Sequence, residues 1–417
     1  MDRFVIRGGA RLSGEIPTGG AKNSALPALA ACLLTEEPVT LHRIPRVRDI
    51  ATMTQLLQAI GARVDKKAGP MRIEARTVAR PEAPYELVKT MRASSLVLGP
   101  LVARTGRARV SLPGGCAIGS RPINFHLAGL ERLGARIRQE AGYIEAEAPA
   151  GLEGAPFSFD RVTVTGTEDL MMAAVLARGE TLLENCAREP EIGDLAELLN
   201  KMGASVEGAG TSKIRIRGVE RLHGAEHTII PDRIEAGTFL IAGAITGGDV
   251  TVTECEPAHQ TALVAKLAQA GVEVTEAGPG ALRVRSDGLK SVDTITEEYP
   301  GFATDLQAQF MALMTRAQGI SLITETIFEN RFMHAQELMR MGANIRLEGR
   351  RAIVAGPSEL SGAAVLASDL RASASLVLAA LVARGETAID RVYHIDRGYE
   401  KIEEKLARAG AQIRRAR

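Results

Sequence analysis

A thiol and a cation lie close together in one glycine-rich stretch, SLPGGCAIGSRP, which runs from Ser111 to Pro122. Glycines precede and follow Cys116, and Arg121 stands five residues beyond it. Glycines give a loop the mobility that a lid needs, and nearby cations lower the pKa of a thiol toward reactivity. We therefore predict that Cys116 is a reactive thiol, with an inert loop or core thiol as the alternative.

The other cysteines fit that alternative better. Cys32, Cys186 and Cys255 lie in apolar or strand-end contexts, and no two of the four form a CxxC pair. So few cysteines in 417 residues indicate reduced thiols and no structural zinc. This pattern is typical of a cytosolic protein.

Several arginines stand where a helix is expected to begin or a loop to turn. Arg92 and Arg371 occupy two similar segments, MRASS and LRASA, and Arg331 and Arg397 lie in loops. A cation at a helix start is unfavourable unless an anion is bound there, and guanidinium groups suit phosphate and carboxylate. These residues are candidates for an anion site; surface charge is the alternative, and it is correct for most Lys and Arg residues.

Two familiar patterns carry no chemistry here. His223–His227, HGAEH, matches the HxxEH pattern of zinc peptidases, but Gly224 and the flanking strand pattern argue against the helix that such a site needs. The phosphate-cradling pattern GxxxxGK[ST] is absent from the sequence. We expect no metal site and no hydrolysis of nucleotides by a P-loop.

The elements that position these residues come from a sixfold repeat. A helical pattern that ends in glycine and leads into an alternating strand recurs at intervals of 68–73 residues. The glycines suit the left-handed cap that turns a helix end into a strand. They are Gly61, Gly134, Gly203, Gly271, Gly342 and Gly410.

Each repeat is expected to read helix, strand, loop, helix, strand, turn, strand. The sixth copy lacks its closing strand, and RFVIRGGARLSGEI at the start of the chain matches KIRIRGVERLHGAE of the third copy. The first strand should therefore complete the sixth repeat. This predicts an α/β fold of two domains with three repeats each, 22–229 and 1–21 with 230–417. Ligands are expected in a cleft between them.

Nine segments together resemble the UDP-N-acetylglucosamine enolpyruvyl transferases, of the enolpyruvyl transferase family. They extend, in order, over nearly the whole sequence, so no single motif bears the assignment. They are GGAKNSALPAL, VKTMRAS, SLPGGCAIGSRP, AREPEI, PDRIEAGTF, TDLQAQF, ENRFMH, DLRASASLVLA and YHIDRGYE.

The resemblance implies a two-domain inside-out α/β barrel and a cofactor-free reaction. The enolpyruvyl (1-carboxyvinyl) group of phosphoenolpyruvate would move to the 3-hydroxyl of UDP-N-acetylglucosamine, and phosphate would leave. This transferase step is the first committed one of peptidoglycan synthesis, and so of cell wall biogenesis, cell shape and cell division. A cysteine in the loop also implies sensitivity to the epoxide antibiotic fosfomycin.

The resemblance also implies roles for particular residues. Cys116 would be the general acid, Asp305 would take the sugar hydroxyl proton, and Lys22, Arg121 and Arg397 would hold phosphoenolpyruvate, with Arg331 and Arg371 in support. Contacts to the UDP-sugar would come from Asn23, Arg92, Arg121, Pro122, Ile123, Asn124, Phe125, Arg161, Val162, Thr163, Val164 and Ile327. Arg161 departs from the lysine that the family often has, which keeps the charge but changes the contact geometry expected with diphosphate.

Bulk properties limit the partners. The formal net charge is +1, which indicates no global field for nucleic acid or an anionic membrane. The longest apolar runs, such as residues 25–34, are about half of what a bilayer requires. We expect a cytoplasmic enzyme on small molecules, with its oligomeric state open. The alternatives are a catalytically silent UDP-sugar sensor, the shikimate-pathway enolpyruvyl transferase and, for His394, an RNA 3′-phosphate cyclase.

Overall fold

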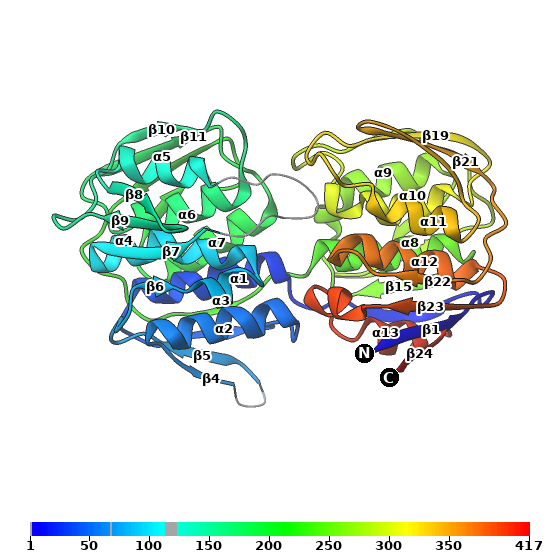
Figure 1. Cartoon of the computed structure of the whole chain (residues 1–417), viewed down its shortest axis with the longest axis horizontal. Coiled ribbons are helices and arrows are strands. Elements are labelled where there is room, and N and C mark those ends of the chain that lie inside the picture. Colours follow the sequence, from blue (N-terminus) through cyan, green and yellow to red (C-terminus); the bar gives the residue numbers. More distant parts are fainter. Residues whose placement is uncertain (1, 67–68, 113–122) are drawn as a thin grey trace. The chain divides into compact units, whose positions relative to one another are not determined.

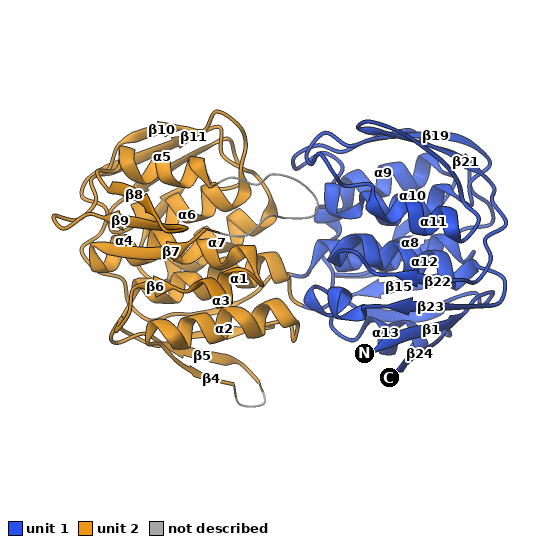
Figure 2. Cartoon of the chain, in the orientation of Figure 1, with its two compact units in different colours: residues 1–19, 116–120, 231–417 blue, residues 20–115, 121–230 orange. Residues whose placement is uncertain are grey.

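The computed structural model describes residues 2–66, 69–112 and 123–417. Residues 2–19 and 231–417 form one compact unit, unit 1, and the described residues from 20 to 230 form unit 2 (Figure 2). In the described ranges, no helix has the length and apolar character to cross a membrane.

Unit 2 contains three four-stranded sheets with the same topology (Figure 1). The first, in the order β14-β3-β5-β4, consists of Glu226–Thr228, Val39–His42, Met71–Glu74 and Arg63–Asp65. The second, β6-β7-β9-β8, consists of Glu82–Ala83, Arg107–Ser111, Tyr143–Glu147 and Arg136–Glu140. The third, β10-β11-β13-β12, consists of Pro156–Ser158, Glu180–Glu184, Lys213–Arg217 and Ser205–Glu207.

Unit 1 repeats this arrangement. Its first sheet, β2-β15-β17-β16, consists of Ser13–Pro17, Asp249–Thr253, Leu282–Arg285 and Glu273–Glu276. The second, β18-β19-β21-β20, consists of Thr294–Ile295, Gly319–Thr324, Arg351–Gly356 and Asn344–Glu348. The third, β22-β23-β1-β24, consists of Ala364–Leu366, Glu386–Asp390, Arg3–Arg7 and Gln412–Ala416.

Strand β1 confirms the prediction for the sixth repeat. It pairs antiparallel with β23 and β24, with Phe4 opposite Ile389 on one side and Arg415 on the other. It thereby takes the place that β13 has in the third repeat.

The expected repeat was wrong in one respect, because every sheet has a fourth strand. This edge strand pairs in parallel with the strand that follows an inner helix, as β6 does with β7 and β18 with β19. β6 and β18 have two residues each, too few to show the alternation that predicts a strand.

Helices form the centre of each unit. In unit 1 these are α8 (Arg233–Ile245), α10 (Gln307–Met314) and α12 (Leu370–Val382), which contact one another. In unit 2 they are α1 (Lys22–Ala31) with η1 (Cys32–Leu34), η2 (Arg92–Val97) with α4 (Leu98–Thr105), and α6 (Val164–Ala174). Every residue of α8 except Arg233 is buried, which is typical of a helix enclosed on all sides.

Amphipathic outer helices complete the repeats. They are α2 (Arg48–Ile60), α5 (Asn124–Arg132), α7 (Pro190–Lys201), α9 (Thr261–Gln269), α11 (Met333–Arg340) and α13 (Ile402–Arg408). The six glycines at their ends all have positive φ, from 84° to 124°, as predicted. Helices inside and sheets outside give the inside-out α/β fold that the resemblance implied. Short elements are α3 (Tyr85–Val88), η3 (Pro257–Gln260), η4 (Thr304–Leu306) and η5 (Val392–Arg397).

Candidate active site

Asp305 joins two arginines from different repeats of unit 1. It lies in η4, directly before the buried helix α10. Its Oδ1 accepts a hydrogen bond from Arg331 Nη2 at 2.7 Å, and its Oδ2 accepts one from Arg371 Nε at 3.3 Å. The Asp305 side chain is 26% exposed, whereas those of Arg331 and Arg371 are 6% and 3% exposed. The carboxylate therefore faces solvent over two buried cations.

Arg371 has hydrogen-bonding capacity that the described residues do not use. It lies in the first turn of α12, whose N-cap Asp369 accepts from the backbone N–H groups of Arg371 and Ala372. Nη1 and Nη2 are buried and have no hydrogen-bond partner among the described residues. A buried guanidinium with unpaired donors is costly, and an anion would satisfy it. This is the strongest sign of an anion site in unit 1.

Residues 398 and 399 lie beside the start of α12, which carries Arg371. Tyr399 is fully buried, with its hydroxyl 2.9 Å from Thr238 Oγ1 and 3.1 Å from Gln309 Nε2. The Arg371 guanidinium lies 5.3 Å from the centre of the Tyr399 ring. Arg397, the last residue of η5, is half-buried two positions before Tyr399. Arg397 thus lies two residues before Tyr399, which packs against Arg371.

Lys22 begins the first helix of unit 2. It is the first residue of α1, and Ala21 provides no side-chain cap. A cation at this helix end is disfavoured by the helix dipole, but Lys22 Nζ lies 3.2 Å from Asp49 Oδ2. Both side chains are nearly buried. Just before them, a Cβ on Gly20 would stand 1.8 Å from the carbonyl oxygen of Arg43, so only glycine fits that approach.

A buried network fixes the start of α1. Ser24 Oγ donates to Asp194 Oδ2 of α7, and Asp194 Oδ1 lies 2.9 Å from His227 Nε2 of β14. The other ring nitrogen, Nδ1, lies 3.2 Å from Lys201 Nζ. Because an ammonium group can only donate, Nδ1 accepts from Lys201 and Nε2–H donates to Asp194. Lys22 and Asn23 therefore start from a helix end that three elements hold.

Arg92 and His126 lie near each other in unit 2. Arg92 begins η2, and His126 lies on α5, 2% exposed, with both ring nitrogens lacking a partner among the described residues. Burial, and then the charge of Arg92, lowers the pKa of His126 to about 4. His126 is neutral near pH 7. Sequence reasoning missed it, because a lone histidine in an apolar helix gives no signal.

The segment 161–164 leads into α6. Arg161 is exposed, and Thr163 is the N-cap, accepting a hydrogen bond from Gly166 N at 3.2 Å. Val164 is the first helical residue. A helix N-terminus can bind a phosphate, and the contact of this segment with diphosphate stays a prediction.

Two buried acids on α6 were also missed. Burial raises the pKa of Asp169 to about 8, although Gly99 N donates to its Oδ1 at 2.8 Å. Burial, together with the negative charges of Glu191 and Glu189, raises the pKa of Glu168 well above its ordinary value. Burial thus favours the neutral form of both carboxyls, and that of Asp169 is largely protonated at neutral pH.

His334 occupies in the fifth repeat the place of His126 in the second. It lies on α11, is 1% exposed, and its ring nitrogens also lack partners within the described ranges. Burial, with a smaller contribution from the positive charge of Arg331, lowers the pKa of His334 to about 4 against the attraction of Asp369. His334 is therefore neutral at pH 7, although Asp369 and Arg331 lie near it.

The remaining predicted residues divide into two groups. Ile123 is buried before α5, Asn124 and Phe125 begin that helix, and Ile327 N donates to Glu325 Oε1 at 2.9 Å. Val162 is half-buried. Cys116, Arg121 and Pro122 lie outside the described residues.

The other three cysteines are buried, as predicted. Burial raises the pKa of Cys186 to about 12 and that of Cys32 higher still. These two thiols are therefore inert at neutral pH.

The HGAEH segment is not helical. Glu226–Thr228 is strand β14, His42 Nε2 lies 2.5 Å from Glu226 Oε1, and His227 belongs to the network of Asp194. This confirms that the pattern lacks the helix of a zinc peptidase site. In the described ranges, no group of three or more His, Cys, Asp or Glu residues could hold a metal ion.

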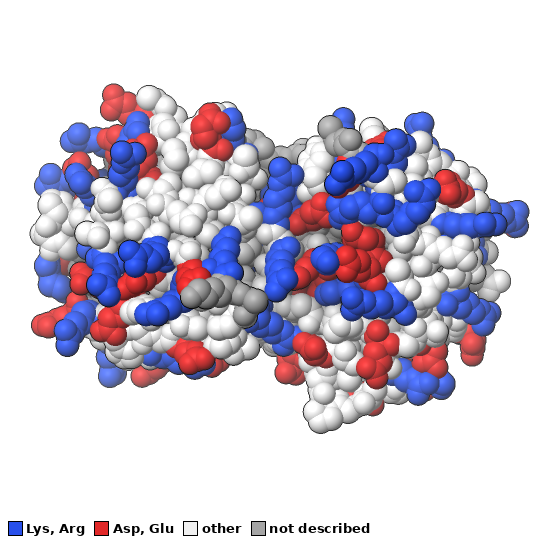
Figure 3. Space-filling model, turned by 90° about the horizontal axis from the view of Figure 1, so that it is seen from below, with Lys and Arg blue, Asp and Glu red and all other residues white. Residues whose placement is uncertain are grey.

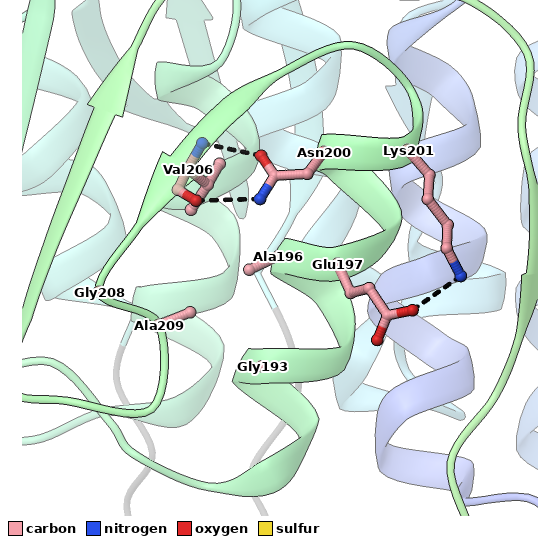
Figure 4. A pocket seen from close by; sticks show the side chains of 8 residues that line it. All are labelled: Gly193, Ala196, Glu197, Asn200, Lys201, Val206, Gly208 and Ala209. Carbon is pink, nitrogen blue, oxygen red and sulfur yellow. Dashed lines mark hydrogen bonds and ion pairs between the residues drawn. The ribbon is translucent and has the colours of Figure 1, made fainter.

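Basic and acidic side chains are interspersed on the face that Figure 3 shows. An open pocket of about 520 Å³ lies beside α7, where Glu197 pairs with Lys201 at 2.7 Å and Asn200 bonds the backbone of Val206 (Figure 4). None of the predicted site residues lines it.

Sequence comparisons assign the chain to a family. The model of the family EPSP synthase (3-phosphoshikimate 1-carboxyvinyltransferase) matches residues 6–406. A relative from Solibacter usitatus, a UDP-N-acetylglucosamine 1-carboxyvinyltransferase, is 74% identical over 100% of both chains. One of the same name from Koribacter versatilis is 66% identical over 100% of this chain and 96% of the relative.

Solved structures share the fold. The enolpyruvyl transferase NikO from Streptomyces tendae matches 100% of this chain and 99% of its own, with a TM-score of 0.88 and 27% identity. An EPSP synthase from Acinetobacter baumannii matches all of both chains, with a TM-score of 0.76 and 21% identity. The second likeness concerns the fold alone.

Proposed function

The chain belongs to the EPSP synthase family of enolpyruvyl transferases, and from this premise we propose that it acts on UDP-N-acetylglucosamine. It transfers the enolpyruvyl group of phosphoenolpyruvate to the sugar 3-hydroxyl and releases phosphate. This is the first committed step of peptidoglycan synthesis, and it would take place in the cytoplasm.

The choice of sugar substrate rests on the close relatives. The family model takes its description from the shikimate enzyme, which was the alternative weighed from the sequence. Relatives at 74% and 66% identity over the whole chain are named for the UDP-sugar instead. The shikimate enzyme of known structure is only 21% identical, so it supports the fold and not the substrate.

One observation in the structure carries the proposal: the unpaired donors of Arg371 beside Asp305 and Arg331. Phosphoenolpyruvate brings a phosphate and a carboxylate, and each can accept two parallel N–H bonds from a guanidinium. Nη1 and Nη2 of Arg371 are buried and without partners among the described residues. A catalytically silent sensor of UDP-sugars would not need this second anion site next to a carboxylate.

The reaction is an addition followed by an elimination. A proton adds to the methylene carbon of phosphoenolpyruvate while the sugar 3-oxygen bonds to the neighbouring carbon and loses its own proton. The methyl group then returns a proton, the carbon–oxygen bond to phosphate breaks, and phosphate leaves with the bonding electrons. The chemistry therefore needs an acid, a base, and cations that hold the charge on phosphate and carboxylate.

We assign these tasks to residues named by the resemblance. Cys116 supplies the proton, since an unperturbed thiol, with a pKa of about 8.5, can hold a proton at neutral pH. Asp305 takes the hydroxyl proton, and its carboxylate is partly exposed beside Arg331 and Arg371. Lys22 and Arg397 hold phosphoenolpyruvate together with Arg121.

The sugar nucleotide is assigned to unit 2. Arg92 and Arg161 supply charge, and the start of α6 at Thr163 and Val164 supplies N–H groups for the diphosphate. The resemblance adds Asn23, residues 121–125 and Ile327 to the proposed contacts with the UDP-sugar. Neutral His126 beside Arg92 offers a further donor, since a neutral imidazole carries one N–H.

Phosphate release in the presence of both substrates tests the proposal. We expect release only when phosphoenolpyruvate and UDP-N-acetylglucosamine are both present, and we expect Cys116→Ser and Asp305→Ala each to lose most of it. Cys255→Ala, at a buried thiol, is the matched control and should keep its activity. Release with shikimate 3-phosphate in place of the UDP-sugar would overturn the assignment.

Covalent labelling tests the role of the thiol separately. Fosfomycin carries an epoxide that a reactive thiol opens, which adds the mass of one inhibitor molecule. We expect this mass on the peptide that contains Cys116 and on no peptide that contains Cys32, Cys186 or Cys255. An unlabelled Cys116 in an active enzyme would refute its assignment as the reactive thiol.

A further inference from the structure

Arg415 of β24 is tied to the residue that precedes Arg397. Its Nη2 donates to Asp396 Oδ1 at 2.6 Å and its Nη1 donates to Asp396 Oδ2 at 3.0 Å. Two parallel bonds of this kind fix the orientation of a carboxylate as well as its position. Asp396 and Arg397 are consecutive residues of η5.

Arg415 is itself held in place from three further sides. Its Nε donates to Glu403 Oε1 of α13 at 2.7 Å, and its Nη1 lies 3.5 Å from Asp2 Oδ2. The guanidinium lies 5.0 Å from the centre of the Phe4 ring on β1, the residue opposite Arg415 in the sheet. One side chain thus connects β1, α13 and η5.

The chain on the other side of Arg397 is also fixed. A Cβ on Gly398 would lie 2.1 Å from Leu370 Cδ1, which shows how closely the backbone approaches α12. Tyr399 is buried against Thr238 and Gln309. The backbone of Arg397 therefore lies between two anchored neighbours, and only the Asp396 anchor consists of an ion pair.

We propose that Arg415 is a positioning residue for Arg397, acting through Asp396, and that it thereby sets the affinity for phosphoenolpyruvate. This rests on the proposed function, in which Arg397 holds that substrate. η5 is a short 3-10 helix, whose hydrogen bonds are weaker than those of an α-helix. Without Arg415, the Asp396 carboxylate loses its bidentate partner, and the turn that carries Arg397 loses its fixed orientation.

Steady-state kinetics of Arg415→Gln test this proposal in the full chain. Because small displacements of a substrate-positioning group have large effects, we expect KM for phosphoenolpyruvate to rise about tenfold. KM for UDP-N-acetylglucosamine and kcat should each change less than about twofold, since their groups are not displaced. Arg415→Lys, which keeps the charge but not the fork, should give an intermediate KM.

Arg414→Gln is the matched control. It makes the same charge change one residue earlier in β24, where alternation places the side chain on the opposite face, and it is exposed. We expect both KM values of this variant to equal those of the wild type.

Asp396→Asn keeps the proposal testable if Arg415→Gln does not fold. Asparagine has nearly the same shape as aspartate, and this variant should raise KM for phosphoenolpyruvate but not KM for the UDP-sugar. The double variant, Asp396→Asn with Arg415→Gln, should have the same KM for phosphoenolpyruvate as Arg415→Gln alone. Equal rises in both KM values, or an unchanged KM for phosphoenolpyruvate in folded variants, would overturn the role of Arg415. A wild type without phosphate release would instead refute the proposed function.

Discussion

Replacing Arg371 with methionine should stabilise the free protein and abolish its response to anions. The side chain of Arg371 is 3% exposed, and two of its three nitrogens lack partners among the described residues. Methionine fills a similar volume without polar atoms. The structure therefore predicts opposite effects of this substitution on stability and on activity.

The magnitude follows from the hydrogen-bond inventory. Each buried unsatisfied donor costs about 1–3 kcal/mol, so Nη1 and Nη2 together cost about 2–6 kcal/mol. The lost bond from Nε to Asp305 offsets about 1.5–3 kcal/mol of this gain, and Asp305 keeps Arg331 as a partner. Taking the middle of each range, we expect the free energy of unfolding of Arg371→Met to exceed that of the wild type by about 2 kcal/mol.

An anion should reverse this order. At a concentration of 100 times its Kd, a bound ligand stabilises the native state by about 2.7 kcal/mol. The wild type should gain this with phosphoenolpyruvate or inorganic phosphate, and the variant should gain little. Phosphate release by the variant should fall to a small fraction of the wild-type rate.

Urea unfolding followed by circular dichroism measures both effects. The chain has no tryptophan, so intrinsic fluorescence would be a weak probe, and urea avoids the screening that guanidinium salts cause. Arg384→Met is the matched control, because Arg384 forms an exposed ion pair with Glu359. Its stability should stay within about 0.5 kcal/mol of the wild type, with an unchanged anion response.

Two results would refute this reasoning. A variant less stable than the wild type in anion-free buffer would show that Arg371 is a structural cation whose donors are already satisfied. An anion that stabilises Arg371→Met as much as the wild type would show that the anion binds elsewhere.

Three further predictions concern the supporting structure. The pKa of Asp169 is raised to about 8. The free energy of unfolding of the wild type should therefore fall, relative to that of Asp169→Asn, by about 1.4 kcal/mol per pH unit between pH 4 and 8. A difference in urea unfolding that stays constant with pH would contradict this. Ser24→Ala leaves the buried Asp194 Oδ2 without the hydroxyl that donates to it. It should lower the free energy of unfolding by about 1–3 kcal/mol and reduce phosphate release. Unchanged stability would refute the network. Gly20→Ala forces a Cβ against the Arg43 carbonyl and should lower the melting temperature by several degrees. Gly193→Ala is the control, because a Cβ there enters open space on α7, and its melting temperature should equal that of the wild type. Equal melting temperatures of the two variants would contradict the close approach at Gly20.

The sign of the Asp169 prediction follows from proton counting. The unfolded carboxyl loses its proton near its ordinary pKa of 3.8, and the folded one keeps it up to about pH 8. Between these values the folded state holds one more proton, so its stability is complete at low pH and falls as the pH rises.

The sixfold repeat could be predicted because its signal is local. Glycine after an outer helix, the apolar inner helix and the alternating strand all lie within one stretch of about 70 residues. The place of β1 in the sixth sheet followed from its similarity to β13. Five of the six parallel edge strands could not be predicted, because two or three residues carry no periodicity and pair only once the fold brings a partner strand beside them; β2, with five residues, is the longer exception.

The sequence by itself determined the reaction class and the residue types, through a resemblance that extends over nearly the whole chain. Only the tertiary structure decided which of those residues lie together. Asp305, Arg331 and Arg371 come from two repeats and meet through packing, and the unpaired donors of Arg371 exist only because it is buried. Arg415 had no motif to mark it. Its role depends on a strand pairing and an ion pair between distant elements, and such contacts are fixed by folding rather than by any local pattern.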